Sequence, residues 1–151
     1  MWYITRAYII KALQSWGLVL VAVAVMFVAS AQPKPDAPYG APMTVYFSGL
    51  MPIFPGWWEV LIKKGGHVIA YGLLAVLTMR AGLMWDRPQR RAAALGVIVT
   101  VGYAVLDEIH QAFVPGRHPS TADIALDLIG AVVFVLAAWR AVRGTLPHAS
   151  S

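Results

Sequence analysis

The sequence predicts an all-α fold: a polytopic membrane protein whose single domain, residues 1–151, forms a bundle of four transmembrane helices. Three observations lead to this prediction. Hydrophobic residues make up 59% of the chain and charged residues 13%, with a mean hydropathy of +0.65. Four apolar runs each approach the roughly 20 residues that a spanning helix needs. None of the runs shows the polar stripe of a helix in a soluble core, so we favour a membrane bundle over a soluble helical protein.

The first span is expected at residues 12–31, where a long apolar run follows Arg6 and Lys11. Basic residues, an apolar run and the small residues ASA at 29–31 also fit a signal peptide with its cleavage site. The preceding segment MWYITRAYII is long and itself apolar, which favours a retained span. In both interpretations residue 32 emerges on the outer face of the membrane.

A proline-rich segment with an aromatic second half separates the first span from the second. It holds six of the ten prolines, so a long regular helix is not expected at its start. The stretch VYFSGLMPIFPGWW, residues 45–58, ends in Trp57 and Trp58, which suit the headgroup belt of a bilayer. We therefore expect an interfacial or re-entrant segment here, rather than an exposed apolar loop that would aggregate.

The other three spans are expected at residues 64–84, 92–112 and 122–142. The connection RAGLMWDRPQRRAA is short and turns at Pro88, so the second and third spans should form an antiparallel hairpin. Ser120 or Thr121 ahead of Asp123 is typical of a helix N-terminus, which places the start of the fourth span nearby. The chain has no cysteine, and this excludes disulfides, thiolate catalysis and cysteine metal ligands.

The net charge of +5 is distributed by side of the membrane. Eight of the twelve lysines and arginines lie before the first span, around the second connection or after the last span. The positive-inside rule therefore places both termini and that connection in the cytoplasm. Topology explains the basic excess, and we expect no nucleic-acid partner. These cations are Arg6, Lys11, Arg80, Arg87, Arg90, Arg91, Arg140 and Arg143.

Polar residues gather at the outer ends of the other three spans, and their helical spacing places them on shared faces. In the second span, positions 64, 67 and 71 are spaced at i, i+3 and i+7 and share one face of the helix. Positions 107 and 111 of the third span, and the aspartates at 123 and 127 of the fourth, are spaced at i and i+4 and share a face in the same way. Gly102 and Gly130 are expected to allow close helix contacts instead. Ionisable groups at membrane depth cost free energy to bury, and they are therefore candidates for a functional role by default. The predicted ligand-binding residues are Lys64, His67, Tyr71, Asp107, Glu108, Gln111, Arg117, Asp123 and Asp127.

The turn FVPGRHPSTAD is expected to hold Arg117 close to Asp107, Glu108 and Asp123. A guanidinium is always charged and binds phosphate or carboxylate through two N–H groups. We therefore interpret Arg117 as a clamp for a ligand or an internal acid, with a plain rim charge as the alternative.

Asp127 lies one turn deeper than Asp123 and needs a partner, either Lys64, His67 or Arg117, or else a proton. Asp123 has the alternative role of a first-turn acid that complements the helix dipole.

The catalytic candidates are His67, Glu108 and Asp107. Adjacent residues on a helix diverge by about 100°, so one of the two acids is expected to hold structure while the other acts. The alternative role of His67 is packing between helices, and the alternative role of Gln111 is a hydrogen bond to the backbone of the turn. We interpret His110 as incidental.

A metal site built from His67 and the carboxylates is the other chemistry to weigh, since nitrogen and oxygen ligands suit several divalent ions. No HExxH or similarly spaced signature is present, and Lys64 and Arg117 would oppose metal binding. We predict no metal and no cofactor.

The stretch KGGHVIAY, followed some forty residues later by DEIHQAFVPGRHPSTADIALDLIG, resembles the VanZ-like family of bacterial integral membrane proteins. The family pattern is roughly K-x-x-H-x-x-x-Y, then D-E-x-x-Q-x-F-x-P-G-R, then D-x-x-x-N-x-x-G, and it spans a little under half the chain. Two positions depart from it: Lys63 replaces a frequent aspartate, and Asp127 replaces an asparagine, which suggests that Lys63 pairs with Asp127 or Glu108. The matching positions are Lys64, His67 and Tyr71; Asp107, Glu108, Gln111, Phe113, Pro115, Gly116 and Arg117; and Asp123 and Gly130.

The resemblance implies a four-span bundle in the bacterial inner membrane and a role in the cell envelope, since the named member is associated with low-level teicoplanin resistance. We expect the polar site to bind the anionic headgroup of a membrane lipid or a lipid-linked envelope precursor. One alternative is an enzyme that modifies such a lipid by acid/base chemistry. Another is a structural protein in which Lys64, Asp107, Arg117 and Asp123 form a salt-bridged knot.

Overall fold

The predicted all-α architecture is confirmed by the structure, a computed structural model that describes residues 2–32 and 56–144, with side chains for 5–32 and 64–143. Those residues form four long helices and no strand. Each helix is long and apolar enough to cross a membrane. The helices are α1 (Trp2–Ser30), α3 (Gly56–Met84), α4 (Gln89–Gln111) and α5 (Thr121–Gly144).

Helix α3 begins two turns earlier than the second predicted span. It starts at Gly56, so Trp57 and Trp58, which we had placed in the interfacial or re-entrant segment, lie in the first turn of this helix, ahead of its candidate membrane span. After Pro55 the sequence contains no proline until Pro88, so no proline interrupts the helix between these positions. The candidate membrane span within α3 is Lys64–Met84. The rest of the expected interfacial segment, residues 45–55, lies outside the described residues.

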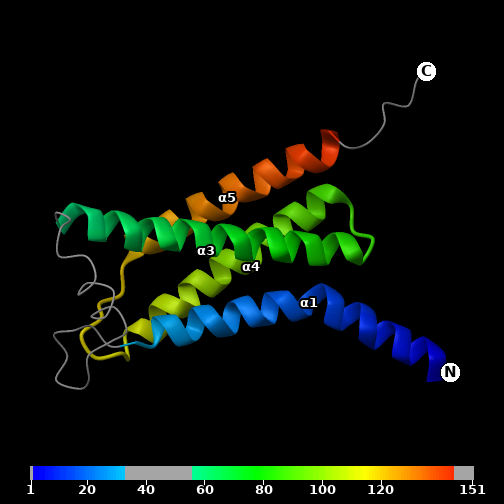
Figure 1. The fold of residues 1–151 in the computed structure, drawn as a ribbon, viewed down its shortest axis with the longest axis horizontal. Coiled ribbons are helices and arrows are strands. Elements are labelled where there is room, and N and C mark those ends of the chain that lie inside the picture. Colours follow the sequence, from blue (N-terminus) through cyan, green and yellow to red (C-terminus); the bar gives the residue numbers. More distant parts are fainter. Residues whose placement is uncertain (1, 33–55, 145–151) are drawn as a thin grey trace.

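Helix α3 is the centre of the bundle and contacts each of the other three helices (Figure 1). Helix α4 also packs on α5, whereas α1 packs mainly on α3, touches α4 slightly and does not contact α5. The start of α1, the α3–α4 turn and the end of α5 lie at one end of the bundle. The α4–α5 connection lies at the opposite end.

Two glycines allow the close approach of helices α3, α4 and α5. A Cβ atom on Gly96 would lie 2.5 Å from the carbonyl oxygen of Ala75, and one on Gly130 would lie 2.5 Å from that of Val68. Both distances are far below van der Waals contact, so only glycine fits there. The prediction for Gly130 is confirmed. The prediction for Gly102 was wrong, because it is exposed and a Cβ there would meet nothing within 4 Å.

The apolar side chains are divided between a thin core and a wide outer surface. Ala75, Met79 and Ala131 are buried where α3 meets α5 and α4, and Leu74 is buried on the side that faces α1. Large apolar side chains cover the outside of the bundle, with Ile98 at 69% exposure. This surface would be unstable in water. Together with the four span-length helices, it identifies a multi-pass membrane protein.

Candidate functional site

The polar residues singled out in the sequence come together at the end of the bundle that holds the α4–α5 connection. They come from the start of α3, the end of α4, the connection itself and the start of α5. We call this group the polar cluster. Its members are Lys64, His67, Tyr71, Asp107, Glu108, Gln111, Arg117, Asp123 and Asp127.

One face of α3 presents the aromatic wall of the polar cluster. The rings of His67 and Tyr71 stack with their centroids 5.9 Å apart and an angle of 10° between the planes. A spacing of four residues places them one above the other on the helix. The ring of Tyr103 on α4 lies 6.0 Å from that of Tyr71. The hydroxyl of Tyr103 donates to the carbonyl oxygen of Val23, which ties the wall to α1.

Asp107 is the buried centre of the cluster. Its Oδ2 atom accepts hydrogen bonds from the Tyr71 hydroxyl at 3.0 Å and from Gln111 Nε2 at 2.7 Å. Its side chain is only 4% exposed, and its Oδ1 atom is buried without a hydrogen-bond partner among the described residues. A buried carboxylate oxygen that lacks a donor is costly, so it is available to a donor that arrives with a ligand.

Arg117 binds Gln111 and not the acids that we had expected. Its Nε and Nη2 atoms donate to Gln111 Oε1 at 3.0 and 2.8 Å. Within the described ranges, no carboxylate forms an ion pair with it. The tight turn at Gly116, with φ of 73°, turns the chain back so that the Arg117 side chain reaches the amide oxygen of Gln111. Gln111 thus connects Arg117 to Asp107 through side chains, whereas we had considered a backbone bond in the turn.

Glu108 has a structural contact, and this separates its role from that of Asp107. Its Oε2 atom accepts a hydrogen bond from the backbone N–H of Ser120, the residue before the first residue of α5. The contact holds the connection against the end of α4. Both acids are buried, yet they bind different partners. This agrees with the expectation that adjacent acids diverge on a helix.

The two aspartates of α5 each face a basic side chain of α3. The side chain of Asp127 is 1% exposed, and its Oδ1 lies 3.4 Å from Nδ1 of His67, whose side chain is 31% exposed. This distance permits an ion pair, but the two atoms lack the alignment of a hydrogen bond. Nearer the surface, Lys64 Nζ lies 3.0 Å from Asp123 Oδ1. The side chain of Lys63, which we had expected to pair with Asp127 or Glu108, lies outside the described residues.

Charge is layered within the cluster. Asp107, Glu108 and Asp127 are almost completely buried, whereas the side chain of Lys64 is 53% exposed and Arg117 is partly exposed. The part of the cluster nearest the surface therefore holds Arg117 and the Lys64–Asp123 pair, with the other acids behind them. In the part of the chain that the structure describes, no three histidine or acidic side chains are grouped as they would be around a metal ion.

His110 has a contact that sequence reasoning did not foresee. Its ring lies 4.4 Å from that of Phe27 on α1, and its Nε2 atom is buried without a partner among the described residues. No spacing rule links a residue of the first span to one of the third. The only signal was that aromatic residues occur at similar depths in the two spans.

A comparison with known families gives one match. A family model described as VanZ/LLP1 matches residues 15–143, a range that contains the whole polar cluster. No curated protein and no solved structure matches the chain.

Proposed function

The chain belongs to the VanZ/LLP1 family, and from this premise we propose that it binds the anionic headgroup of a membrane lipid or lipid-linked envelope precursor at the polar cluster. The proposed location is the bacterial inner membrane. Both termini would face the cytoplasm and the polar cluster the outside. A link to glycopeptide resistance, as for teicoplanin, belongs to the same proposal.

The orientation rests on the cations at the other end of the bundle. The α3–α4 turn, the start of α1 and the end of α5 share that end, and they carry most of the lysines and arginines. Basic segments stay in the cytoplasm during insertion. The polar cluster, at the opposite end, then meets the outer leaflet.

The bond between Arg117 and Gln111 is the observation that carries the binding proposal. Two of the five N–H groups of the guanidinium bind Gln111, which fixes its orientation without neutralising its charge. The other N–H groups have no acceptor among the described residues. A guanidinium held in this way is suited to phosphate, which it binds through two parallel N–H groups. Lys64 adds a second but weaker cation from α3, because its ammonium also pairs with Asp123 at 3.0 Å.

The buried acids favour a headgroup that carries hydrogen-bond donors as well as a negative charge. Asp107 Oδ1 and Asp127 Oδ1 are buried acceptors without a hydrogen-bond donor among the described residues. A hydroxyl or amide of the headgroup would satisfy them while its phosphate meets the outer cations. The acids would also repel an anion that lacks such donors, and this gives the site selectivity.

Native mass spectrometry of the protein, extracted gently from its own membrane, tests the proposal. The parent should retain a specific anionic lipid or precursor, and Arg117→Ala should lose it. Arg140→Ala is the matched control, because it removes the same charge from an exposed position at the other end of the bundle. Equal retention by the parent and Arg117→Ala would refute the binding site.

The pair formed by His67 and Asp127 favours a second candidate function, an enzyme that modifies such a lipid. A buried carboxylate beside a partly exposed imidazole can orient the ring and stabilise its cation during proton transfer. Of the three catalytic candidates His67 therefore has the best geometry, since Glu108 is engaged by Ser120 and Asp107 by Tyr71.

Replacing Asp127 with the family's asparagine separates these two functions. Asp127→Asn keeps the shape of the side chain and removes its charge. If the site only binds, ligand retention should stay within a few-fold of the parent. If the site is catalytic, turnover of the retained lipid should fall by about 10²–10⁴-fold, the usual contribution of general acid/base catalysis. If the parent protein changes no lipid, the enzyme hypothesis is refuted.

A further inference from the structure

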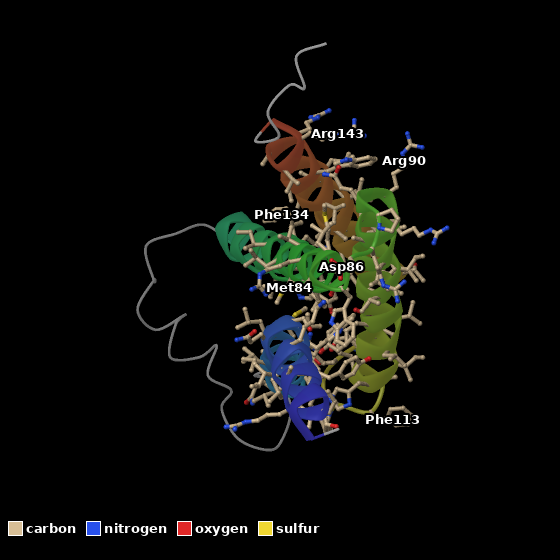
Figure 2. All side chains as sticks on the ribbon, turned by 90° about the vertical axis from the view of Figure 1, so that its right-hand side faces the viewer. Met84, Asp86, Arg90, Phe113, Phe134 and Arg143 are labelled. Atoms are coloured by element: carbon tan, nitrogen blue, oxygen red, sulfur yellow. The ribbon has the colours of Figure 1, made fainter. Side chains whose placement is uncertain are left out.

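A groove at the opposite end of the bundle has the features of a second site. It has a volume of about 670 Å³ and lies between the first part of α1 and the α3–α4 turn. Figure 2 looks onto this end, where Asp86 lies near the middle and Arg90 and Arg143 lie towards α5. The groove residues that matter are Tyr8, Trp16, Trp85, Asp86, Arg87 and Arg91.

The walls of the groove are held in place by contacts between α1 and the turn. Trp85 Nε1 donates to Ser15 Oγ at 2.8 Å, and Ser15 Oγ donates to the carbonyl oxygen of Lys11 at 2.7 Å. The ring of Tyr8 meets that of Trp85 edge to face, with centroids 4.8 Å apart. These contacts fix the indole from two sides, so the groove exists before a ligand arrives. Ligand binding therefore has to immobilise few side chains, which keeps its entropic cost low.

The groove has an excess of positive charge. Its only acid, Asp86, pairs with Lys11 at 3.3 Å, and the same ammonium lies 5.4 Å from the centre of the Trp85 ring. Arg87 and Arg91 are exposed, and no acid of residues 5–32 or 64–143 forms an ion pair with either. Two arginines that line the groove thus have no acid partner among the described residues.

The position of the groove favours an anion that is part of a lipid. The candidate spans Lys64–Met84 and Gln89–Gln111 end and begin beside Trp85 and Arg87, so the turn side of the groove lies at the ends of two spans. Indole rings and arginines at that depth are typical of contacts with lipid headgroups. A soluble phosphate would bind the same arginines but would gain nothing from the indole walls.

We propose that this groove binds the phosphate of an anionic glycerophospholipid, with Arg87 and Arg91 on the phosphate and Trp16 and Trp85 beside the glycerol. This site is separate from the polar cluster. Tyr8, Lys11 and Ala12 precede residue 15, where the family match begins. The groove is therefore built partly outside the matched residues.

The test uses the full chain reconstituted in vesicles of phosphatidylglycerol and phosphatidylethanolamine, with bound lipid counted by native mass spectrometry. Arg87→Gln/Arg91→Gln should lose a phosphatidylglycerol with an affinity drop of about 100-fold or more, since a hydrogen bond to a charged group contributes about tenfold or more for each arginine. Arg90→Gln/Arg140→Gln removes the same charge from the same end and should keep the lipid. Equal loss in both variants would overturn the groove in favour of general surface charge.

A second variant changes binding in the opposite direction. Asp86→Asn removes the only acid of the groove, and asparagine tolerates the positive φ of 57° at this position. It should retain phosphatidylglycerol more tightly than the parent. Inorganic phosphate at millimolar concentration should not displace the lipid. Displacement by phosphate would reassign the groove to a soluble anion, and unchanged lipid binding in both groove variants would reject the site.

Discussion

Substituting Gly130 with alanine should separate α5 from α3 at the point where the polar cluster is assembled. The added Cβ would lie 2.5 Å from the carbonyl oxygen of Val68, 3.0 Å from its Cα and 3.1 Å from its carbonyl carbon. All three atoms belong to the backbone, so no side chain can rotate away. The two helices must therefore move apart.

The size of the movement follows from these distances. Restoring an ordinary contact of 3.4 Å requires a shift of about 0.9 Å. Val68 follows His67 directly, and Gly130 lies one turn after Asp127, so the same shift would stretch their 3.4 Å contact beyond 4 Å. Overpacking of this kind typically costs about 1–3 kcal/mol of unfolding free energy. Gly130→Ala should therefore weaken both the bundle and the ion pair.

Gly102→Ala is the matched control, because the same methyl group meets nothing within 4 Å on an exposed face of α4. Its unfolding free energy should equal or exceed that of the parent by up to about 1 kcal/mol. The measurement is unfolding in mixed micelles at increasing SDS, followed by tryptophan fluorescence, together with ligand retention. If Gly130→Ala is as stable as Gly102→Ala, the close approach of α3 and α5 does not hold the cluster together.

Three further predictions concern single contacts of the cluster. Glu108→Ala should lower the unfolding free energy by about 1–3 kcal/mol because the N–H of Ser120 loses its acceptor, whereas Glu108→Gln should cost less; SDS unfolding compares the two. Lys64→Gln should lower the unfolding free energy by at most about 1 kcal/mol, since its pair with Asp123 is partly exposed, yet it should weaken headgroup retention. If the charge-swapped variant Lys64→Asp/Asp123→Lys restores both folding and retention, the cluster is only a structural knot. Gln111→Ala should release the guanidinium it orients and reduce retention in native mass spectrometry without abolishing it.

The helices were predictable because their lengths are set by simple limits. Four apolar runs long enough to cross the thickness of a membrane form four helices, and Pro88 separates α3 from α4 as expected. The second span was predicted at residues 64–84, the bounds of the candidate span in α3, but the helix itself begins at Gly56. Aromatic residues after a proline fit an irregular interfacial segment and a helix equally well, so composition did not reveal that Trp57 and Trp58 are helical.

Contacts within one helix were also predictable, whereas most contacts between helices were not. The stacking of His67 on Tyr71 follows from their spacing alone. The bond from Tyr71 to Asp107 depends on how α3 and α4 are rotated, which is set by small-residue contacts such as that at Gly96. Gly102 is equally small and has no such contact. Periodicity alone does not reveal which glycine faces a neighbouring helix.

The partner of Arg117 was not predicted because charge alone guided the inference. A guanidinium near three acids was expected to clamp either a ligand or one of those acids, but its amide contact keeps its charge available and still couples it to Asp107. A direct ion pair would have oriented the guanidinium and neutralised it at once, leaving little attraction for an anion. An amide between the two charges orients without neutralising. The contact that the sequence did not reveal is therefore the one that best explains how a site with several buried acids can still bind a negatively charged headgroup.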